Sequence, residues 1–481
     1  MDATTIPQHL LTSNIAPLDA ELTILLQAIA DTEARLQVLH ETAPERDALV
    51  ARAEQYKAIL SPVRRVPPEL VCEVLAMVPC TRKIGSQTVD QPPWKLGHVC
   101  RSWRHWALGC PWLWCSFSIV HRKDDFREDF PLVMLETQIL RAATVPLSID
   151  FHWLKGDGLE GTFFWDLLLP LCHRWKSLCM KFPHLESAES LLDLLHSTKD
   201  HLSSLATVEL MIRSEGDPEW QAVERDLFST APRLRELLLS DVCRVHYSPN
   251  MSAPWSQITR YRAVQEGPQI LHMLQNSPNL VECSLGFDSL DELDATHHRI
   301  MVVVPHLRRL SVDSSIILAY ITAPSLEHLS TDGRLSCALS FVQRSSCRLK
   351  SLAIGSVSDV DSLVPLLEAC SSVEQLVLCG GTPVPTFLFD LNLCPNLTLL
   401  GFGLRCFPDT TWKESLFQMI ETRYQTGRLR AARVYRVDAR FTDTFLDEMR
   451  VAIENLANEG LDIEYLEDQN EFIDHFNEFS Y

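Results

Sequence analysis

The fold is decided by a short motif that recurs in the second half of the chain, as in PHLRRLSV at residues 305–312 and PSLEHLS at residues 324–330. In most copies a Pro, Ser or Cys precedes a pattern close to L-x-x-L-x-L, and several copies follow a stretch with helical spacing of apolar residues, such as residues 190–196. Most steps between copies are 19 to 29 residues long, and one step is 46 residues. The steps are counted between Leu205, Leu234, Leu280, Leu307, Leu326, Leu349, Val373 and Leu397.

Units of this length, with one strand and one helix each, cannot bury an apolar face alone and have to stack. The sequence therefore predicts an α/β fold in which residues 116–458 form a solenoid with a curved parallel sheet. The 46-residue step indicates either a degenerate copy near Tyr261 or an inserted loop. The acidic residues 459–481 are expected to cap the last unit, with an interaction segment as the alternative.

The open face of this sheet is the expected binding surface for a partner. In each strand the motif leucines point inward and the intervening residues line the open face. Their mixed chemistry suits a protein surface more than a phosphate or a single small ligand. The candidate target-binding residues are Glu236, Glu282, Arg309, Asp313, His328 and Gln375.

The N-terminal residues 1–61 predict a helical arm. From Leu22 to Leu60 apolar residues recur mostly at steps of three, four or seven, which is heptad-like spacing, and Pro44 divides the stretch into two helices. Such helices could dimerise as a coiled coil or form a pair that packs on itself or on the next domain.

A second distinctive stretch predicts a small helical domain at residues 62–115. It reads VPPELVCEVLAMV at residues 66–78 and WKLGHVCRSWRHWALGCPWLW at residues 94–114. The prolines begin a helix with an apolar stripe, and Pro79 ends it. So short a segment cannot readily hide all of this apolar surface internally, so a partner surface is expected.

This stretch resembles the F-box, in its fungal F-box-like form, through PPEL at residues 67–70, LGHVCRSWRHWA at residues 96–107 and PWLW at residues 111–114. The polar insert at residues 80–93 is longer than the compact F-box turn. The repeats resemble irregular leucine-rich repeats, which often accompany an F-box. The resemblance implies a three-helix domain that docks on a Skp-type adaptor and, through it, on a cullin scaffold. The adaptor contacts that it implies are Pro67, Pro68, Leu70, Val74, Leu75, Val99, Cys100 and Trp103.

Composition narrows the class of protein further. The chain has 481 residues, 46% of them hydrophobic, and a formal net charge of −20, which argues for several folded parts and against a nucleic-acid partner. The longest apolar runs are too short to cross a bilayer, and the N-terminus has no signal-peptide pattern, so we expect a soluble protein of the cytoplasm, the nucleus or both. The 15 Cys residues lie among apolar neighbours without a C-x-x-C pair, which is typical of buried, reduced thiols.

The sequence predicts neither a catalytic residue, nor a cofactor, nor a metal site. It has no nucleotide-binding, hydrolase or zinc-protease motif, and the pair His297 and His298 and the group His98, Cys100 and His105 are interpreted as structural. The expected function is therefore that of a substrate-recognition subunit of a Skp/cullin/F-box ubiquitin ligase, with an unknown protein target. The alternative is an interaction scaffold without ubiquitin transfer.

Overall fold

The computed structural model divides into two compact units, residues 1–152 and residues 153–481. The predicted boundaries near residues 61 and 115 both fall inside the first unit. The described residues are 6–39, 44–77, 83–84, 93–121, 130–153, 163–182, 185–212, 225–240, 250–286, 301–355, 360–380, 390, 392–404, 410–436 and 443–466.

The first unit begins with a short helix, α1 (Gln8–Thr12), and two longer ones, α2 (Asp19–Val38) and α3 (Arg46–Ile59). The side chain of Glu21 caps α2 by accepting a hydrogen bond of 2.9 Å from the Leu18 backbone N–H. Helices α2 and α3 pack on each other, and an ion pair of 2.6 Å joins Lys57 to Glu33 across them. Their shared apolar core consists of Ile6, Leu10, Leu25, Ile29 and Ile59.

The next part of the first unit contains helix α4 (Pro68–Ala76), which begins at the predicted prolines because proline at the first helical position loses no helical hydrogen bond. Trp114 anchors this part: its Nε1–H donates to the Ala107 carbonyl over 2.7 Å, and the guanidinium of Arg141 lies 4.3 Å from its ring centre. The other elements are η1 (Pro62–Arg65), β1 (Lys83–Ile84), η2 (Lys95–His98), α5 (Arg101–Gly109), η3 (Pro111–Leu113), β2 (Ser116–His121), α6 (Phe130–Arg141) and β3 (Leu147–Trp153).

The second unit is a parallel sheet in which each strand pairs with the next one along the chain, apart from the small pair β9 (Val302–Val303) and β11 (Ile321–Thr322). Within the second unit, the strands of this sheet are β4 (Trp175–Phe182), β5 (Thr207–Ile212), β6 (Glu236–Ser240), β7 (Arg260–Val264), β8 (Glu282–Gly286), β10 (Arg309–Val312), β12 (His328–Thr331), β13 (Ser351–Ile354), β14 (Gln375–Gly380), β15 (Leu399–Leu404), β16 (Ala431–Arg436) and β17 (Asp462–Leu466).

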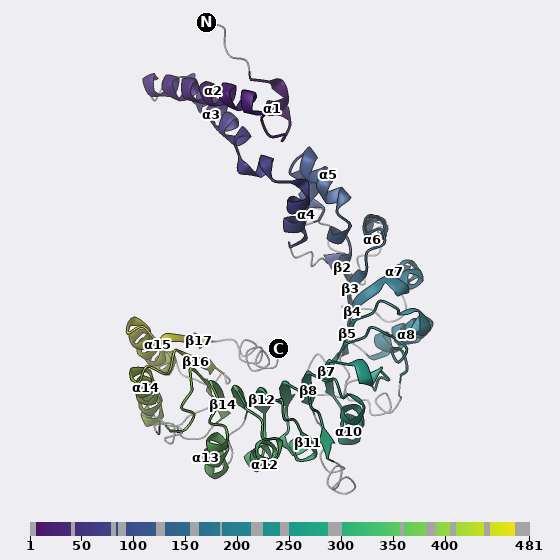
Figure 1. The fold of residues 1–481 in the computed structure, drawn as a ribbon, viewed down its shortest axis with the longest axis vertical. Helices are drawn as coiled ribbons and strands as arrows, with labels where there is room; N and C mark the ends of the chain where they lie inside the picture. Colours follow the sequence, from purple (N-terminus) through teal and green to yellow (C-terminus); the bar gives the residue numbers. More distant parts are fainter. Residues whose placement is uncertain are drawn as a thin grey trace. The chain divides into compact units, whose positions relative to one another are not determined.

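Helices and turns connect the strands of the second unit on one side of the sheet. In Figure 1 the strands follow the inner side of an arc and the helices lie along its outer side. The helical elements are α7 (Phe163–Leu168), η5 (Leu169–Arg174), α8 (Leu185–His196), η6 (Lys199–His201), η7 (Trp255–Gln257), α10 (Gly267–Asn276), η8 (Ser315–Tyr320), α12 (Leu335–Ser345), α13 (Val360–Ala369), α14 (Thr410–Gln425) and α15 (Asp443–Asn458).

The recurring leucines build the core of this unit. In the two copies quoted first, Leu307, Leu310, Leu326 and Leu329 are each at most 1% exposed. Before each strand of the large sheet from β5 to β15, a backbone carbonyl accepts two N–H groups from the start of the next strand in the sheet, as when the Arg308 carbonyl accepts from residues 327 and 328. These paired hydrogen bonds hold successive motifs in the same register. The predicted α/β fold with a large parallel sheet is therefore confirmed.

The long step between motif copies contains strand β7 at Tyr261, so the degenerate copy is the correct one of the two alternatives. Tyr261 is 1% exposed and takes the inward position that leucine takes elsewhere. The predicted cap falls largely outside the described residues, which end at residue 466, within β17. Within the described ranges, no helix combines the length and the apolar character needed to cross a bilayer.

Candidate functional site: a charged row and an exposed apolar stripe

Five of the six predicted target-binding residues come together in one line across the sheet. The strand register places Glu236 beside Arg260, Arg260 beside Glu282, Glu282 beside Arg309, and Arg309 beside His328. We call Glu236, Arg260, Glu282, Arg309 and His328 the charged row; Arg260 was not among the predicted residues. The same register continues through residue 351 to Gln375. In each strand the following residue points into the core, so the row lies on the open face away from the helices.

Charges alternate along the row and pair with their neighbours. Arg260 lies 3.8 Å from Glu236 through Nη1 and 3.2 Å from Glu282 through Nε. The other oxygen of Glu282 lies 3.6 Å from Nη1 of Arg309. Partly exposed pairs of this kind contribute on the order of 0–1 kcal/mol each to stability. Their larger effect is to fix the order of charge that a partner would meet.

Sequence reasoning missed Arg260, which lies between Glu236 and Glu282 in the row. Its strand lacks the motif leucines, so a degenerate copy near Tyr261 was only one of two alternatives and no open-face residue was assigned there. The signal that could have found it is alternation: Arg260 and Arg262 flank the buried Tyr261 and therefore share the open face.

His328 ends the row as a neutral group. Burial lowers the pKa of its imidazole, and the positive charge of Arg309 lowers this pKa further. The ring is therefore uncharged at pH 7 and acts as a hydrogen-bonding group. His328 Nδ1 has no hydrogen-bond partner among the described residues, and neither do the hydroxyl oxygens of Ser330 and Ser351.

Asp313 does not join the charged row. It lies one residue beyond the end of β10, and its backbone N–H donates to the Leu285 carbonyl over 3.2 Å. That Asp313 lines the open face stays a prediction: its side chain is exposed, and it lies off the line of the other five because strand β10 ends at Val312.

The first unit carries a different candidate surface, on helix α4. Its apolar residues form two stripes offset by one position. Val71 and Leu75 are 6% and 2% exposed and belong to the interior. In contrast, Leu70, Val74 and Met77 are 51%, 61% and 79% exposed, and their spacing places them on one side of the helix. We call these three residues the exposed apolar stripe.

The remaining predicted adaptor contacts divide between surface and interior. Pro67, Pro68 and Val99 are exposed, whereas Trp103 is half-buried. Cys100 caps helix α5, since its sulfur accepts from the Trp103 backbone N–H over 3.4 Å and from the Asn14 amide over 2.8 Å. Leu75 is corrected from a contact residue to a core residue, because its side chain is closed off from solvent.

Metal-ligating clusters and reactive thiols are two further kinds of group that could carry chemistry. No group of three or more His, Cys, Asp and Glu side chains within the described ranges is placed to hold a metal ion, and His297 and His298 lie outside those ranges. Burial raises the pKa of Cys347 and Cys394 to about 11, which keeps both thiols protonated and weakly reactive at pH 7.

In comparisons with known proteins, no protein-family model and no curated protein matches the chain.

Proposed function

We propose that this chain is a substrate-recognition subunit of a Skp/cullin/F-box ubiquitin ligase. In this proposal the part around α4 and α5 is an F-box-like domain that docks on a Skp-type adaptor, and the second unit is an irregular leucine-rich-repeat array that holds a protein target. The chain itself performs no chemistry. It brings the target close to the ubiquitin-loaded partners, and proximity supplies the rate enhancement.

The observation that carries the proposal is the exposed apolar stripe of Leu70, Val74 and Met77. A short helix that already buries Val71 and Leu75 has no internal need for a second apolar stripe. Val63 and Val99, 51% and 60% exposed, add apolar surface within the same short helical segment. Several exposed apolar side chains on one side of a helix are typical of a helix that packs on a partner protein.

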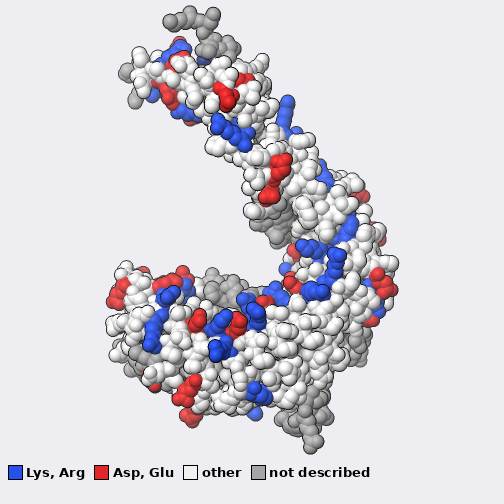
Figure 2. Space-filling model, in the orientation of Figure 1, with Lys and Arg blue, Asp and Glu red and all other residues white. Residues whose placement is uncertain are grey.

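The charged row supports the second half of the proposal. Its alternating carboxylates and guanidiniums, followed by a neutral imidazole and the half-buried Gln375, offer donors and acceptors along the whole open face. Figure 2 shows acidic and basic side chains intermixed along the second unit. Mixed charge suits a protein surface with complementary polar groups.

The test is co-purification of the full chain with a Skp-type adaptor, comparing the original chain with the Leu70→Asp/Val74→Asp variant. Each substitution places a carboxylate where apolar area would be buried, at a cost of about 1–2 kcal/mol, so adaptor binding should weaken by about 100-fold. The matched control is Leu140→Asp on α6, a similarly exposed leucine of the same unit at 79%.

The outcomes separate the proposed function from the alternative. Binding by the original chain and by the control, but not by the double variant, would support adaptor docking. Adaptor binding without recruitment of a cullin would favour the interaction scaffold. If the folded original chain fails to bind the adaptor, the proposal is wrong.

A further inference from the structure

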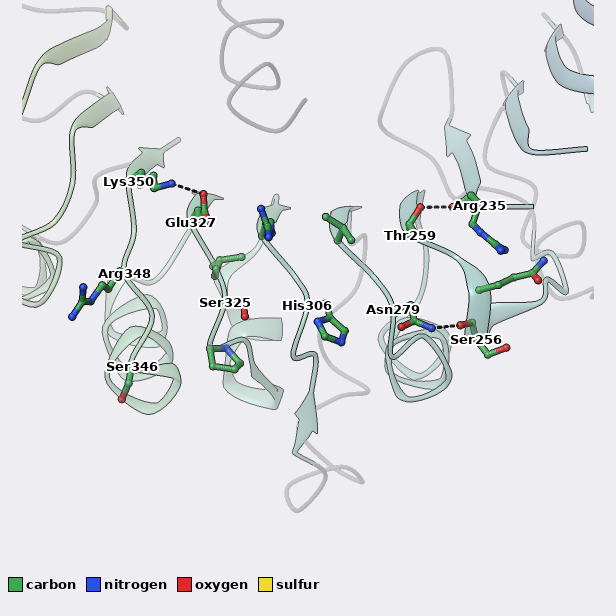
Figure 3. Close-up of a pocket in the computed structure, with 15 residues that line it drawn as sticks. Arg235, Ser256, Thr259, Asn279, His306, Ser325, Glu327, Ser346, Arg348 and Lys350 are labelled. Carbon is green, nitrogen blue, oxygen red and sulfur yellow. Dashed lines mark hydrogen bonds and ion pairs between the residues drawn. The ribbon is translucent and has the colours of Figure 1, made fainter. Parts of the chain in front are cut away.

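A groove of about 1090 Å³ runs along the edge of the parallel sheet where strands β6 to β13 begin. It is lined by residues that directly precede the strands, such as Arg235, Arg308, Glu327 and Lys350, and by turns that lead into them. Figure 3 shows the labelled residues spread over successive strands and their connections, with Arg235 at one end and Arg348 and Lys350 at the other. We call this the edge groove.

The charge of the edge groove is opposite to that of the chain. The chain has 63 acidic and 43 basic residues, yet the groove lining has the cations Arg235, Arg308, Arg348 and Lys350 against one carboxylate, Glu327. Lys350 pairs with Glu327 over 2.8 Å, and this hydrogen bond lowers the pKa of the Glu327 carboxyl, so the two charges offset each other. The three arginines give the groove its net positive charge.

These arginines are available to a ligand. Arg235, Arg308 and Arg348 are exposed, and none of the three forms a close ion pair with a carboxylate among the described residues, although the charge of Arg308 helps to lower the pKa of Glu327. The walls between them are held by side chains that are already satisfied, as where the Asn279 amide donates to the Ser256 carbonyl over 2.7 Å. The groove is therefore a fixed polar channel with guanidiniums placed along it.

We propose that the edge groove binds an extended, acidic segment of a partner protein. Neighbouring strands lie about 4.8 Å apart, so the five strand-to-strand steps from β6 to β13 span about 24 Å, the length of about seven extended residues. Across the sheet, Arg308 lies three steps from Arg235, about 14 Å, and two steps from Arg348, about 10 Å, with Arg348 two residues earlier relative to its strand than Arg308 is. Carboxylates spaced about four and then three residues apart would each meet one guanidinium, a pairing that is strong and directional.

Nucleic acid fits this groove less well than peptide. Single strands are held by aromatic side chains on which bases stack, and no Phe, Tyr or Trp is among the residues that line the groove. The inference deepens the proposed function, and it rests on that function only in making the second unit the target-binding part.

The test is fluorescence anisotropy with the full chain in the absence of any adaptor. The probe is a fluorescein-labelled Ser/Gly peptide of about nine residues with Glu at the first, fifth and eighth positions, and its neutral counterpart has Gln there. We expect the acidic peptide to bind at least about tenfold more tightly than the neutral one, and its affinity to fall as salt rises.

Variants locate the binding. Arg308→Glu/Arg348→Glu should weaken it by about tenfold or more, whereas Arg35→Glu/Arg52→Glu, the same change in net charge on exposed residues of the first unit, should leave it unchanged. Glu327→Gln removes the one carboxylate among the described residues of the groove lining and should tighten binding several-fold. Circular dichroism melting checks that each variant folds.

Each outcome supports or overturns the proposal that the edge groove binds an acidic peptide segment. Equal affinities of the acidic and neutral peptides, or equal effects of the two double variants, would overturn the inference. Tighter binding of an oligonucleotide with the same charge would overturn the choice of peptide. A phosphoserine peptide that binds more tightly than the Glu peptide, with the same loss in the groove variant, would support the groove and identify phosphate as the source of negative charge. Failure of adaptor binding would leave this result untouched, because no adaptor is present.

Discussion

The charged row predicts that Arg260 stabilises the second unit by keeping two carboxylates apart. Its guanidinium lies between Glu236 and Glu282, at 3.8 Å and 3.2 Å, and its side chain is 27% exposed. Arg260→Glu would place three carboxylates side by side on adjacent strands, where like charges directly opposite each other are destabilising. Arg260→Met, the matched control, keeps most of the apolar stem and removes the charge alone.

The magnitude follows from the two ion pairs. At about 0.5 kcal/mol each, their loss costs about 1 kcal/mol in the Met variant, and two new repulsive contacts of similar size bring the Glu variant to about 2 kcal/mol. Both costs refer to low ionic strength. In about 1 M salt the screening length falls to about 3 Å, so the difference between the two variants should shrink by at least half.

The assay is urea unfolding followed by circular dichroism, in about 20 mM and about 1 M NaCl, because urea leaves the ionic strength unchanged. At low salt the unfolding midpoint should fall in the order original chain, Met variant, Glu variant. Equal midpoints for the two variants at low salt, or a gap between them that salt does not change, would refute the account of the row as a set of interacting charges.

Three other predictions concern the core and the titrating groups. Leu352→Ala, at a motif leucine that is fully buried, should lower the free energy of unfolding by about 2–5 kcal/mol, whereas Leu70→Ala, at a half-exposed leucine, should cost less than about 1 kcal/mol in the same urea titration. The pKa of His328 is lowered in the folded chain, so protonation of this imidazole opposes folding. The contribution of neutral His328 to stability is complete above about pH 6.5 and is lost as pH falls through the folded pKa. His328→Gln should therefore flatten the loss of stability below about pH 6.5, and an unchanged slope would contradict this. Cys283 and Cys370 are 3% and 2% exposed and burial raises the pKa of both, so neither should react with a thiol reagent at pH 8 until urea unfolds the chain, as mass spectrometry of the labelled protein can check.

Much of the second unit could be predicted from the chain alone. Leu310 and Val312 flank the polar Ser311, which is the alternation of a half-buried strand, and the repeat length leaves room for one connecting helix or turn. Alternation also predicted that Glu236, Glu282, Arg309, His328 and Gln375 share one face. These predictions hold because a strand has only two sides, so the buried side determines the exposed one.

Which apolar residues of helix α4 are buried and which are exposed could not be predicted from the sequence. Its apolar residues Leu70, Val71, Val74 and Leu75 form one broad stripe in the sequence, and nothing local distinguishes its two edges. The structure buries Val71 and Leu75 and exposes Leu70 and Val74, because only one edge faces the rest of the unit. The prediction that Leu75 is a contact residue was wrong for this reason.

The sequence by itself determined the class of fold, the inward leucines and the side of each strand that faces solvent, because these depend on the local periods of strand and helix. Only the tertiary structure decided which side chains are neighbours. Arg260 joined the charged row, Asp313 was left out of it, and Arg235, Arg308 and Arg348 came to line one groove. Those relations depend on the hydrogen-bonded register between strands that are 20 or more residues apart in places, and no local pattern carries that register.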